Sequence, residues 1–286
     1  EVVAQRQGGL LDILVDKESK NNVYLCFSKR EAEGVSTALS VSSLRNNELI
    51  STKILFSSNN RSNSTVHFGC RIGIKGNYVY LSIGDRGDRH QSQNPRSHAG
   101  SIIKINKYNG SLPSGSNFQN NWLPELFTKG HRNPQGMAIH LENGDIWVNE
   151  HGPKGGDEIN ILRKGKNYGW PIVTHGKEYF GGKVGNGIKT LKGFEDPIWY
   201  WVPSIAPSGM AFYNKDMFPE FKGHLLVSSL KFKSIYLVKL KSGLPYSENV
   251  FFKNKFGRIR DIEVLRDGSI LIINDRRDGG VYRLFR

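Results

Sequence analysis

A histidine, an aspartate and several arginines occur in glycine-rich parts of the sequence that could together perform acid–base chemistry. His67 and Asp85 are of the types that form an oriented general base, in which the carboxylate fixes the imidazole tautomer and stabilises the imidazolium. Arginines such as Arg132, Arg258 and Arg260 bind oxyanions through a planar fork and keep their charge when buried. These residue types predict a site for an anionic, oxygen-rich ligand beside a general base.

The segment at 151–158, "HGPKGGDE", is too constrained for a plain turn. The backbone carbonyls of Gly152 and Pro153 are hard oxygen donors of the kind that suits Ca²⁺. Asp157 and Glu158 could neutralise or coordinate a nearby cation. The alternative is a rigid loop with solvated acids.

The elements that must position these residues are repeated hairpins. Each repeat is a short apolar run, a polar turn that often carries Gly, and a denser β-branched run, and the repeats span 8–28, 68–84, 133–150, 207–229 and 259–275. Their spacing favours the blades of a β-propeller, with outer strands at 100–107 and 234–240; a jelly roll or sandwich is the alternative. Because no linker divides the chain, we predict one domain over residues 1–286.

In a propeller, the loops that enter and leave the inner hairpins converge although they are distant in sequence. We therefore expect the polar residues at these positions to lie close together. Those at the entries are His67, Arg132, Asn133, Gln135, Ser204, Ser208, Arg258 and Arg260, and those at the exits are Asp85, Glu150, His151, Gly152, Pro153 and Lys231.

Composition excludes some classes of function. The 286 residues carry a net charge of +14, but the basic residues are scattered, so we expect no nucleic-acid partner. Because no apolar run approaches the roughly 20 residues of a membrane span, we expect no membrane insertion. There is no signal-peptide pattern at Glu1. Cys26 and Cys70 lie in apolar runs, and we expect buried free thiols.

The long central motif resembles the soluble glucose/sorbosone dehydrogenases, a family of aldose sugar dehydrogenases that use pyrroloquinoline quinone (PQQ). The motif is "GHRNPQGMAIH…GDIWVNEHGPKGGDEINILRKGKNYGWP", and the resemblance continues in "QGGLLD", "HFGCR", "LSIGDRGDR", "VPSIAPSGMAFY" and "GRIRD". It spans essentially the whole chain in the family's order.

The resemblance implies a role for each motif residue. His67 would take the proton from the anomeric hydroxyl of an aldose, with Asp85 orienting it, while a hydride passes to PQQ and a lactone is formed. Arg132 would polarise the quinone carbonyl and Asn133 would help to hold the cofactor.

Further residues would bind the cofactor's charged groups and its metal. Gly152 and Pro153 would bind the Ca²⁺ that chelates PQQ. The remaining implied ligands are Lys231, Arg258 and Arg260 for the PQQ carboxylates, Ser204 nearby, and Glu178 and Glu195 for a second calcium.

The implied fold is all-β, a six-bladed β-propeller of four-stranded antiparallel blades. Two departures stand out: a hairpin that family members carry upstream of "QGGLLD" is absent, so the first blade is expected to be incomplete at the N-terminus, and Val66 precedes His67 where the family often has a second His. We expect a periplasmic or secreted monomer that passes electrons to an artificial or respiratory acceptor. The alternative is a non-catalytic extracellular propeller binding module or an inactive truncated homologue.

Overall fold

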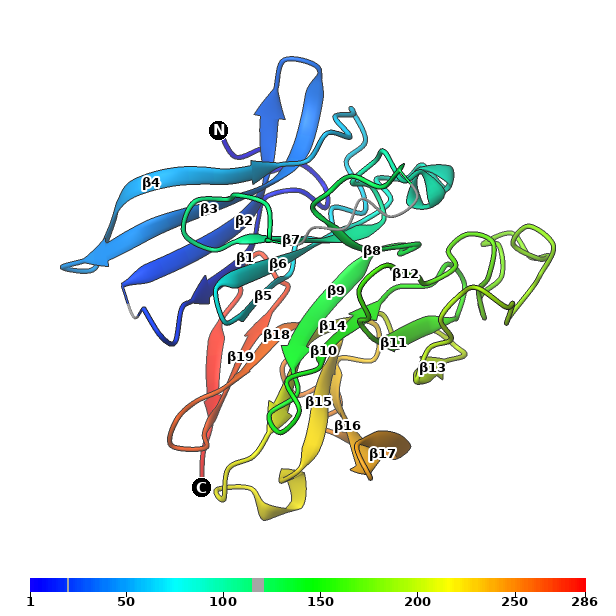
Figure 1. The fold of residues 1–286 in the computed structure, drawn as a ribbon. Helices are drawn as coiled ribbons and strands as arrows, with labels where there is room; N and C mark the ends of the chain where they lie inside the picture. Colours follow the sequence, from blue (N-terminus) through cyan, green and yellow to red (C-terminus); the bar gives the residue numbers. More distant parts are fainter. Residues whose placement is uncertain (20, 115–120) are drawn as a thin grey trace. The chain divides into compact units, whose positions relative to one another are not determined.

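The computed structural model describes residues 1–19, 21–114 and 121–286, which form β-sheets joined by loops and short 3-10 helices (Figure 1). Their contacts divide the chain into two compact units. Unit 1 comprises Glu1–Pro134, Arg163–Val173 and Thr190–Glu195, and unit 2 comprises Gln135–Leu162, Thr174–Lys189 and Asp196–Arg286. The single-domain assignment for residues 1–286 stays a prediction.

Unit 1 contains two sheets. The first has the order β1-β2-β3-β4 and the second the order β12-β8-β7-β6-β5. Neighbouring strands are antiparallel except for the short parallel pair β12 and β8. The bounds are β1 Leu10–Val15, β2 Asn22–Glu31, β3 Gly34–Arg45, β4 Glu48–Ser57, β5 Ile72–Lys75, β6 Tyr78–Ile83, β7 Ser101–Asn106, β8 Leu126–Lys129 and β12 Lys166–Asn167, with a 3-10 helix, η1, at Arg89–Gln93.

Turn chemistry explains why the first sheet has four strands. Asn46 and Asn47, between β3 and β4, have φ values of 48° and 65°, which a two-residue hairpin turn requires and asparagine tolerates. The core of unit 1 lies between its two sheets. Tyr24 and Leu39 from the first sheet pack there with Leu81 from the second, all fully buried.

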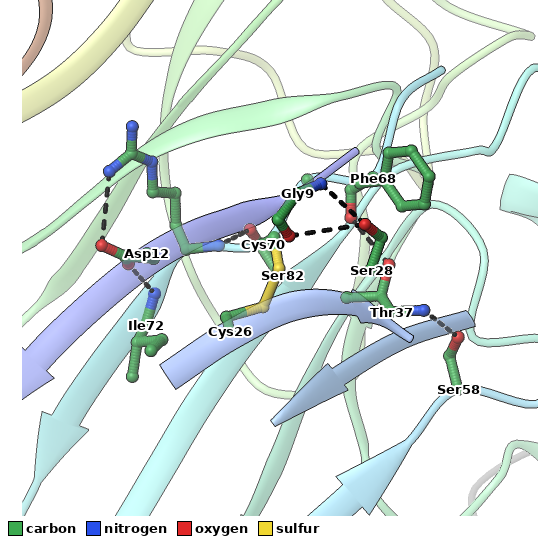
Figure 2. The surroundings of a disulfide bond; sticks show 12 residues. Gly9, Asp12, Cys26, Ser28, Thr37, Ser58, Phe68, Cys70, Ile72 and Ser82 are labelled. Atoms are coloured by element: carbon green, nitrogen blue, oxygen red, sulfur yellow. Dashed lines mark hydrogen bonds and ion pairs between the residues drawn. A yellow bond between two sulfur atoms is a disulfide. The ribbon is translucent and has the colours of Figure 1, made fainter. Parts of the chain in front are cut away.

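Cys26 and Cys70 form a disulfide bond in this core (Figure 2). Cys26 lies on β2 and Cys70 just before β5, and their Cα atoms are 5.6 Å apart. The prediction of burial is confirmed, since both side chains are fully buried, but the prediction of free thiols is wrong. Only the packing of the first sheet against the second brings these two residues, 44 positions apart, within bonding distance.

Unit 2 contains three sheets, with the orders β13-β11-β10-β9, β14-β15-β16-β17 and β18-β19-β20. Large apolar side chains such as Trp147, Phe212 and Tyr213 fill its core. The bounds are β9 Pro134–Ile139, β10 Ile146–Glu150, β11 Asp157–Ile161, β13 Trp199–Trp201, β14 Pro207–Tyr213, β15 His224–Ser229, β16 Ser234–Lys241, β17 Leu244–Phe251, β18 Ile259–Val264, β19 Ile270–Asn274 and β20 Val281–Leu284, with a 3-10 helix, η3, at Pro219–Phe221.

The prediction of an all-β chain built from propeller blades is confirmed, but the number of blades is wrong. The described residues form five sheets of three to five strands, where six four-stranded blades were expected. Each of the five hairpins found in the sequence forms the start of one sheet: β1–β2, β5–β6, β9–β10, β14–β15 and β18–β19. The prediction of an incomplete first blade is also wrong, because β3 and β4, within residues 34–57, bring the first sheet to four strands.

No helix in the described part of the chain is long and apolar enough to cross a membrane.

Candidate active site

In unit 1 the structure brings together His67 and Asp85, with 2.7 Å between Nδ1 of the histidine and Oδ1 of the aspartate. The Asp85 side chain is 2% exposed and that of His67 is 17% exposed. His67 has a φ of 51°, a left-handed conformation that costs a non-glycine residue energy and is found mostly at functional sites. The side chain of Gln7 helps to hold it there by accepting a hydrogen bond from the His67 backbone N at 2.8 Å.

Two glycines allow the chain segments that carry this pair to approach each other. A Cβ atom on Gly84 would overlap the carbonyl oxygen of His67, and one on Gly69 would lie 2.7 Å from the backbone N of Gly84. Gly69 also has a φ of 65°. Gly69 of the "HFGC" motif and Gly84 of the "GDRG" motif are therefore required by close backbone contact.

The carboxylate of Asp85 is fully engaged. Oδ1 also accepts a hydrogen bond from the backbone N of Gly87 at 2.8 Å, and Oδ2 accepts one from the indole Nε1 of Trp170 at 2.8 Å. Burial alone raises the pKa of Asp85, but the hydrogen bond and charge of His67, with the Gly87 bond and the charge of Arg132, lower it below its ordinary value. Because an ionised carboxylate has no proton to donate, Nδ1 of His67 carries the hydrogen, and in the neutral ring Nε2 carries the lone pair.

Arg132 and Asn133 lie against the same pair. The backbone N of Asp85 donates to the carbonyl oxygen of Arg132 at 2.8 Å. The Arg132 guanidinium is buried 5.3 Å from the ring centroid of Trp170. Oδ1 of Asn133 accepts a hydrogen bond from the backbone N of Gly69 at 3.2 Å, so this side chain also supports the loop of His67.

In unit 2 the loop that holds Gly152 and Pro153 is organised by Asp157. Its Oδ1 accepts a hydrogen bond from the backbone N of Gly152 at 2.9 Å, and its Oδ2 accepts from Ser204 Oγ at 2.6 Å and from the backbone N of Ala206 at 2.9 Å. This buried carboxylate therefore connects the loop of Gly152 to the segment that carries Ser204 and Ala206. A Cβ on Gly152 would overlap the carbonyl oxygens of Gly155 and Gly156, so the loop is crowded with backbone oxygen.

Arg258 and Arg260 form a basic pair in unit 2. Both donate to Oδ2 of Asp275, at 3.2 Å and 2.9 Å, and Arg260 also donates to Gln135 Oε1 at 3.2 Å. Burial raises the pKa of Asp275, but the charges and hydrogen bonds of Arg260 and Arg258 outweigh burial and bring the pKa below its ordinary value. The carboxylate is therefore ionised at neutral pH. Lys231, in the turn after β15, is exposed, with Nζ 5.1 Å from the Phe232 ring.

Glu150 and Glu158 are direct cross-strand neighbours on β10 and β11. Nδ2 of Asn160 donates to both carboxyl groups, at 3.2 Å and 3.4 Å. Burial and the charge of Glu150 raise the pKa of Glu158 well above its ordinary value. The sequence pointed to Glu150 at a hairpin exit and to Glu158 as a possible cation ligand, but it did not indicate that the two would pair.

Glu178 and Glu195, the predicted ligands of a second calcium, are assigned to different units. Oε1 of Glu195, in unit 1, lies 2.9 Å from Nζ of Lys166, while Glu178 lies in unit 2. Among the described residues, no group of three or more His, Cys, Asp or Glu side chains could hold a metal. The assignment of Glu178 and Glu195 stays a prediction.

Within each unit, residues that the sequence placed at hairpin ends do meet. His67, Asp85, Arg132 and Asn133 form one group, Gln135 and Arg260 a second, and Gly152 and Ser204 a third through Asp157. Sequence reasoning missed Gln7, Trp170 and Asp275 as supporting residues. The only signal for the first two was their place in the quoted motifs "QGGLLD" and "NYGWP".

The sheets are those of a β-propeller, and the pair of His67 and Asp85 is the arrangement expected of a propeller enzyme. A profile of the Glucose / Sorbosone dehydrogenase family matches residues 1–283, and the chain belongs to this family. It is 32% identical over 293 residues to the aldose sugar dehydrogenase YliI of Escherichia coli, covering 99% of this chain and 79% of the relative. The alternative of a non-catalytic binding module therefore gives way to an oxidoreductase.

Solved structures agree with this assignment. The crystal structure of the soluble aldose sugar dehydrogenase of E. coli in its apo-form has a TM-score of 0.93 at 32% identity, covering 100% of this chain and 85% of that chain. The PQQ-bound aldose sugar dehydrogenase of Streptomyces coelicolor has a TM-score of 0.78 at 23% identity, covering 99% of this chain and 81% of that chain. At that identity the second likeness establishes the fold alone.

Proposed function

We propose that this protein oxidises aldose sugars at the anomeric carbon to the lactone, with PQQ and Ca²⁺ as its cofactors. The observation that carries the proposal is the 2.7 Å contact between Nδ1 of His67 and Oδ1 of an ionised, buried Asp85. That contact leaves Nε2 of His67 free to act as a base on a sugar hydroxyl.

The residues of unit 1 would perform the proton half of the reaction. Nε2 of His67 takes the proton of the anomeric hydroxyl, and Asp85 stabilises the imidazolium that results. When bound, PQQ supplies the acceptor for the hydride, and its Ca²⁺ supplies a Lewis acid. Arg132, buried beside Trp170, places a fixed positive charge for an oxygen that becomes more negative.

The chemistry of the donor groups in unit 2 supports these cofactors. Arg258 and Arg260 are held side by side on Asp275, and with the exposed Lys231 their guanidinium groups suit a ligand that bears several carboxylates. Backbone carbonyls in the loop of Gly152 and Pro153 suit Ca²⁺, and Asp157 and Ser204 would hold that loop in place rather than bind the metal. The S. coelicolor relative binds PQQ, and we extend that cofactor to this chain.

The disulfide between Cys26 and Cys70 supports a periplasmic or secreted location, because such bonds persist in oxidising compartments. The physiological electron acceptor would then lie outside the cytosol.

The test is dye reduction by the purified protein with PQQ, Ca²⁺ and glucose or other aldoses. We expect turnover in the native protein, and a loss of about 10²–10⁴-fold in His67→Ala with cofactor absorbance retained. His224→Gln, a substitution of a histidine on β15 in unit 2, is the matched control and should keep its turnover. Turnover unchanged in His67→Ala, or no turnover in the native protein with PQQ bound, would contradict the proposal.

A further inference from the structure

Unit 1 contains a polar cavity of about 550 Å³ whose lining includes Asp85 of the active-site pair but not His67. Its walls come from residues 59–62, Ser64, the turn at 85–88 and the segment 91–99. Asp85 contributes to one wall, but His67, Gly87 and Trp170 already engage its two carboxylate oxygens. A ligand in this cavity must therefore be recognised by other groups.

Asn60 is the first of these groups. Its amide oxygen and amide nitrogen are both buried, and neither has a hydrogen-bond partner in the described part of the chain. A buried amide without partners costs free energy, so such groups usually mark the place of a bound molecule. Because Asn60 offers one acceptor and two donor hydrogens, a hydroxyl group, which can donate and accept, is its natural complement.

Arg86 is the second group. Its guanidinium is fixed by hydrogen bonds from Nη1 to the carbonyl oxygen of Val66 and from Nη2 to that of Ser64, and it lies 3.5 Å from the ring centroid of Phe68. Its Nε atom is buried and has no partner within the described residues. Burial lowers the pKa of Arg86 to about 10, so the group is still charged at neutral pH.

One arginine at the cavity can meet an anion. Arg61, Arg86 and Arg96 line the cavity together with Asp85 and Asp88, and once the pair of Arg61 with Glu33 is counted the three arginines are balanced by three acids. Arg61 and Arg96 are exposed at its edge, where they can meet a charged group without a desolvation cost. Arg61 is also 3.1 Å from Glu33, so Arg96 is the freer of the two.

We propose that this cavity binds a sugar acid, a polyhydroxylated carboxylate of the aldonic type. The carboxylate of such a ligand pairs with Arg96 at the edge, and its hydroxyl groups bond to the amide of Asn60, whose buried N and O are reached when this side chain turns into the cavity. The volume lies within the range of small-molecule sites. Binding here does not depend on PQQ. The proposed reaction forms a lactone, and addition of water across the ester bond of that lactone gives a sugar acid. Only this link to the reaction rests on the proposed function.

Isothermal titration calorimetry on the protein without PQQ tests the proposal, with gluconate, glucose and acetate as probes. We expect saturable binding of gluconate at one site, and affinities at least roughly tenfold lower for glucose, which lacks the charge, and for acetate, which lacks the hydroxyls. Asn60→Ala and Arg96→Ala should each weaken gluconate binding by roughly tenfold. Asn63→Ala and Arg45→Ala, exposed substitutions outside the cavity, should not.

His67→Ala separates this site from the active site, since it should leave gluconate affinity unchanged. Equal affinity for glucose or for acetate would overturn the assignment of a sugar acid. Loss of binding in His67→Ala, together with normal binding in the Asn60 and Arg96 variants, would place the ligand in the active site and overturn the proposal. Arg96 is exposed, so its variant gives an answer even if Asn60→Ala does not fold.

Discussion

Trp170 donates its indole hydrogen to Oδ2 of Asp85 over 2.8 Å, and so occupies the carboxylate oxygen that His67 does not use. The two residues are 85 positions apart in the sequence, and both lie in unit 1. The same indole ring lies 5.3 Å from the guanidinium of Arg132. One aromatic side chain therefore helps to fix the orientation of both a carboxylate and an arginine.

Trp170→Phe should slow turnover by about tenfold, because it frees the carboxylate to rotate away from His67 while keeping the aromatic ring. The measurement is kcat with a saturating aldose in the dye-reduction assay. Trp199→Phe is the matched control, since the buried Nε1 of Trp199 has no partner in the described part of the chain. Equal kcat values in the two variants would show that the Asp85 contact has no role in turnover.

Asp85→Asn should reduce turnover by about 10²–10⁴-fold, because an amide cannot stabilise the imidazolium of His67. Stability supplies a second measurement. The pKa of Asp85 is lower in the folded protein than its ordinary value of 3.8, so its ionised form stabilises the fold above that pH, and this contribution is lost as the pH falls through the folded pKa.

The destabilisation of Asp85→Asn should therefore be present at pH 7 and shrink below pH 3.8. Urea denaturation of the variant and the native protein at several pH values measures this difference. A difference that stays constant down to strongly acidic pH would argue against an ionised Asp85.

Glu158→Gln should stabilise the protein at neutral pH. The pKa of Glu158 is higher in the folded protein than its ordinary value. Protonated Glu158 therefore stabilises the fold at low pH, and this contribution is lost as the pH rises through the folded pKa. Glutamine removes the repulsion from Glu150 and should raise the free energy of unfolding by about 1 kcal/mol at pH 7.

The gain should disappear in acid, where Glu158 itself is protonated. Glu142→Gln removes the same charge from an exposed turn of unit 2 and serves as the control. A gain in both variants would point to net charge rather than to the pair of Glu150 and Glu158.

Local sequence was sufficient to predict the inner strands and two of the outer ones, since the outer strands expected at 100–107 and 234–240 are present as β7 and β16. All five hairpins were predictable because a short apolar run, a turn and a second apolar run lie next to one another in the chain. β4 was not, because most of its residues are exposed and its apolar pattern is weak. The turn at Asn46 and Asn47 was the available signal. The number of blades failed for another reason, since six came from the family resemblance while the repeats themselves numbered five.

Contacts between distant segments were beyond the sequence. The pairing of His67 with Asp85 could be inferred from repeat positions, since His67 precedes and Asp85 follows the hairpin β5–β6. Nothing in the spacing indicated that Trp170 would reach Asp85, or that Asp275 would lie between two arginines. The disulfide is the clearest case, because each cysteine by itself has the surroundings of a buried free thiol.

Removal of that disulfide should cost both stability and activity. For a separation of 44 residues, the chain-entropy estimate is roughly 4 kcal/mol, so Cys26→Ala/Cys70→Ala should lower Tm by on the order of 10 °C. Cys70 follows His67 by three residues, and it anchors that segment to β2 (Figure 2). Activity below the melting range should thus fall further than in Val79→Ala, which weakens the same core without freeing the segment. Equal activity in the two variants, with the Tm loss observed, would restrict the disulfide to a role in stability.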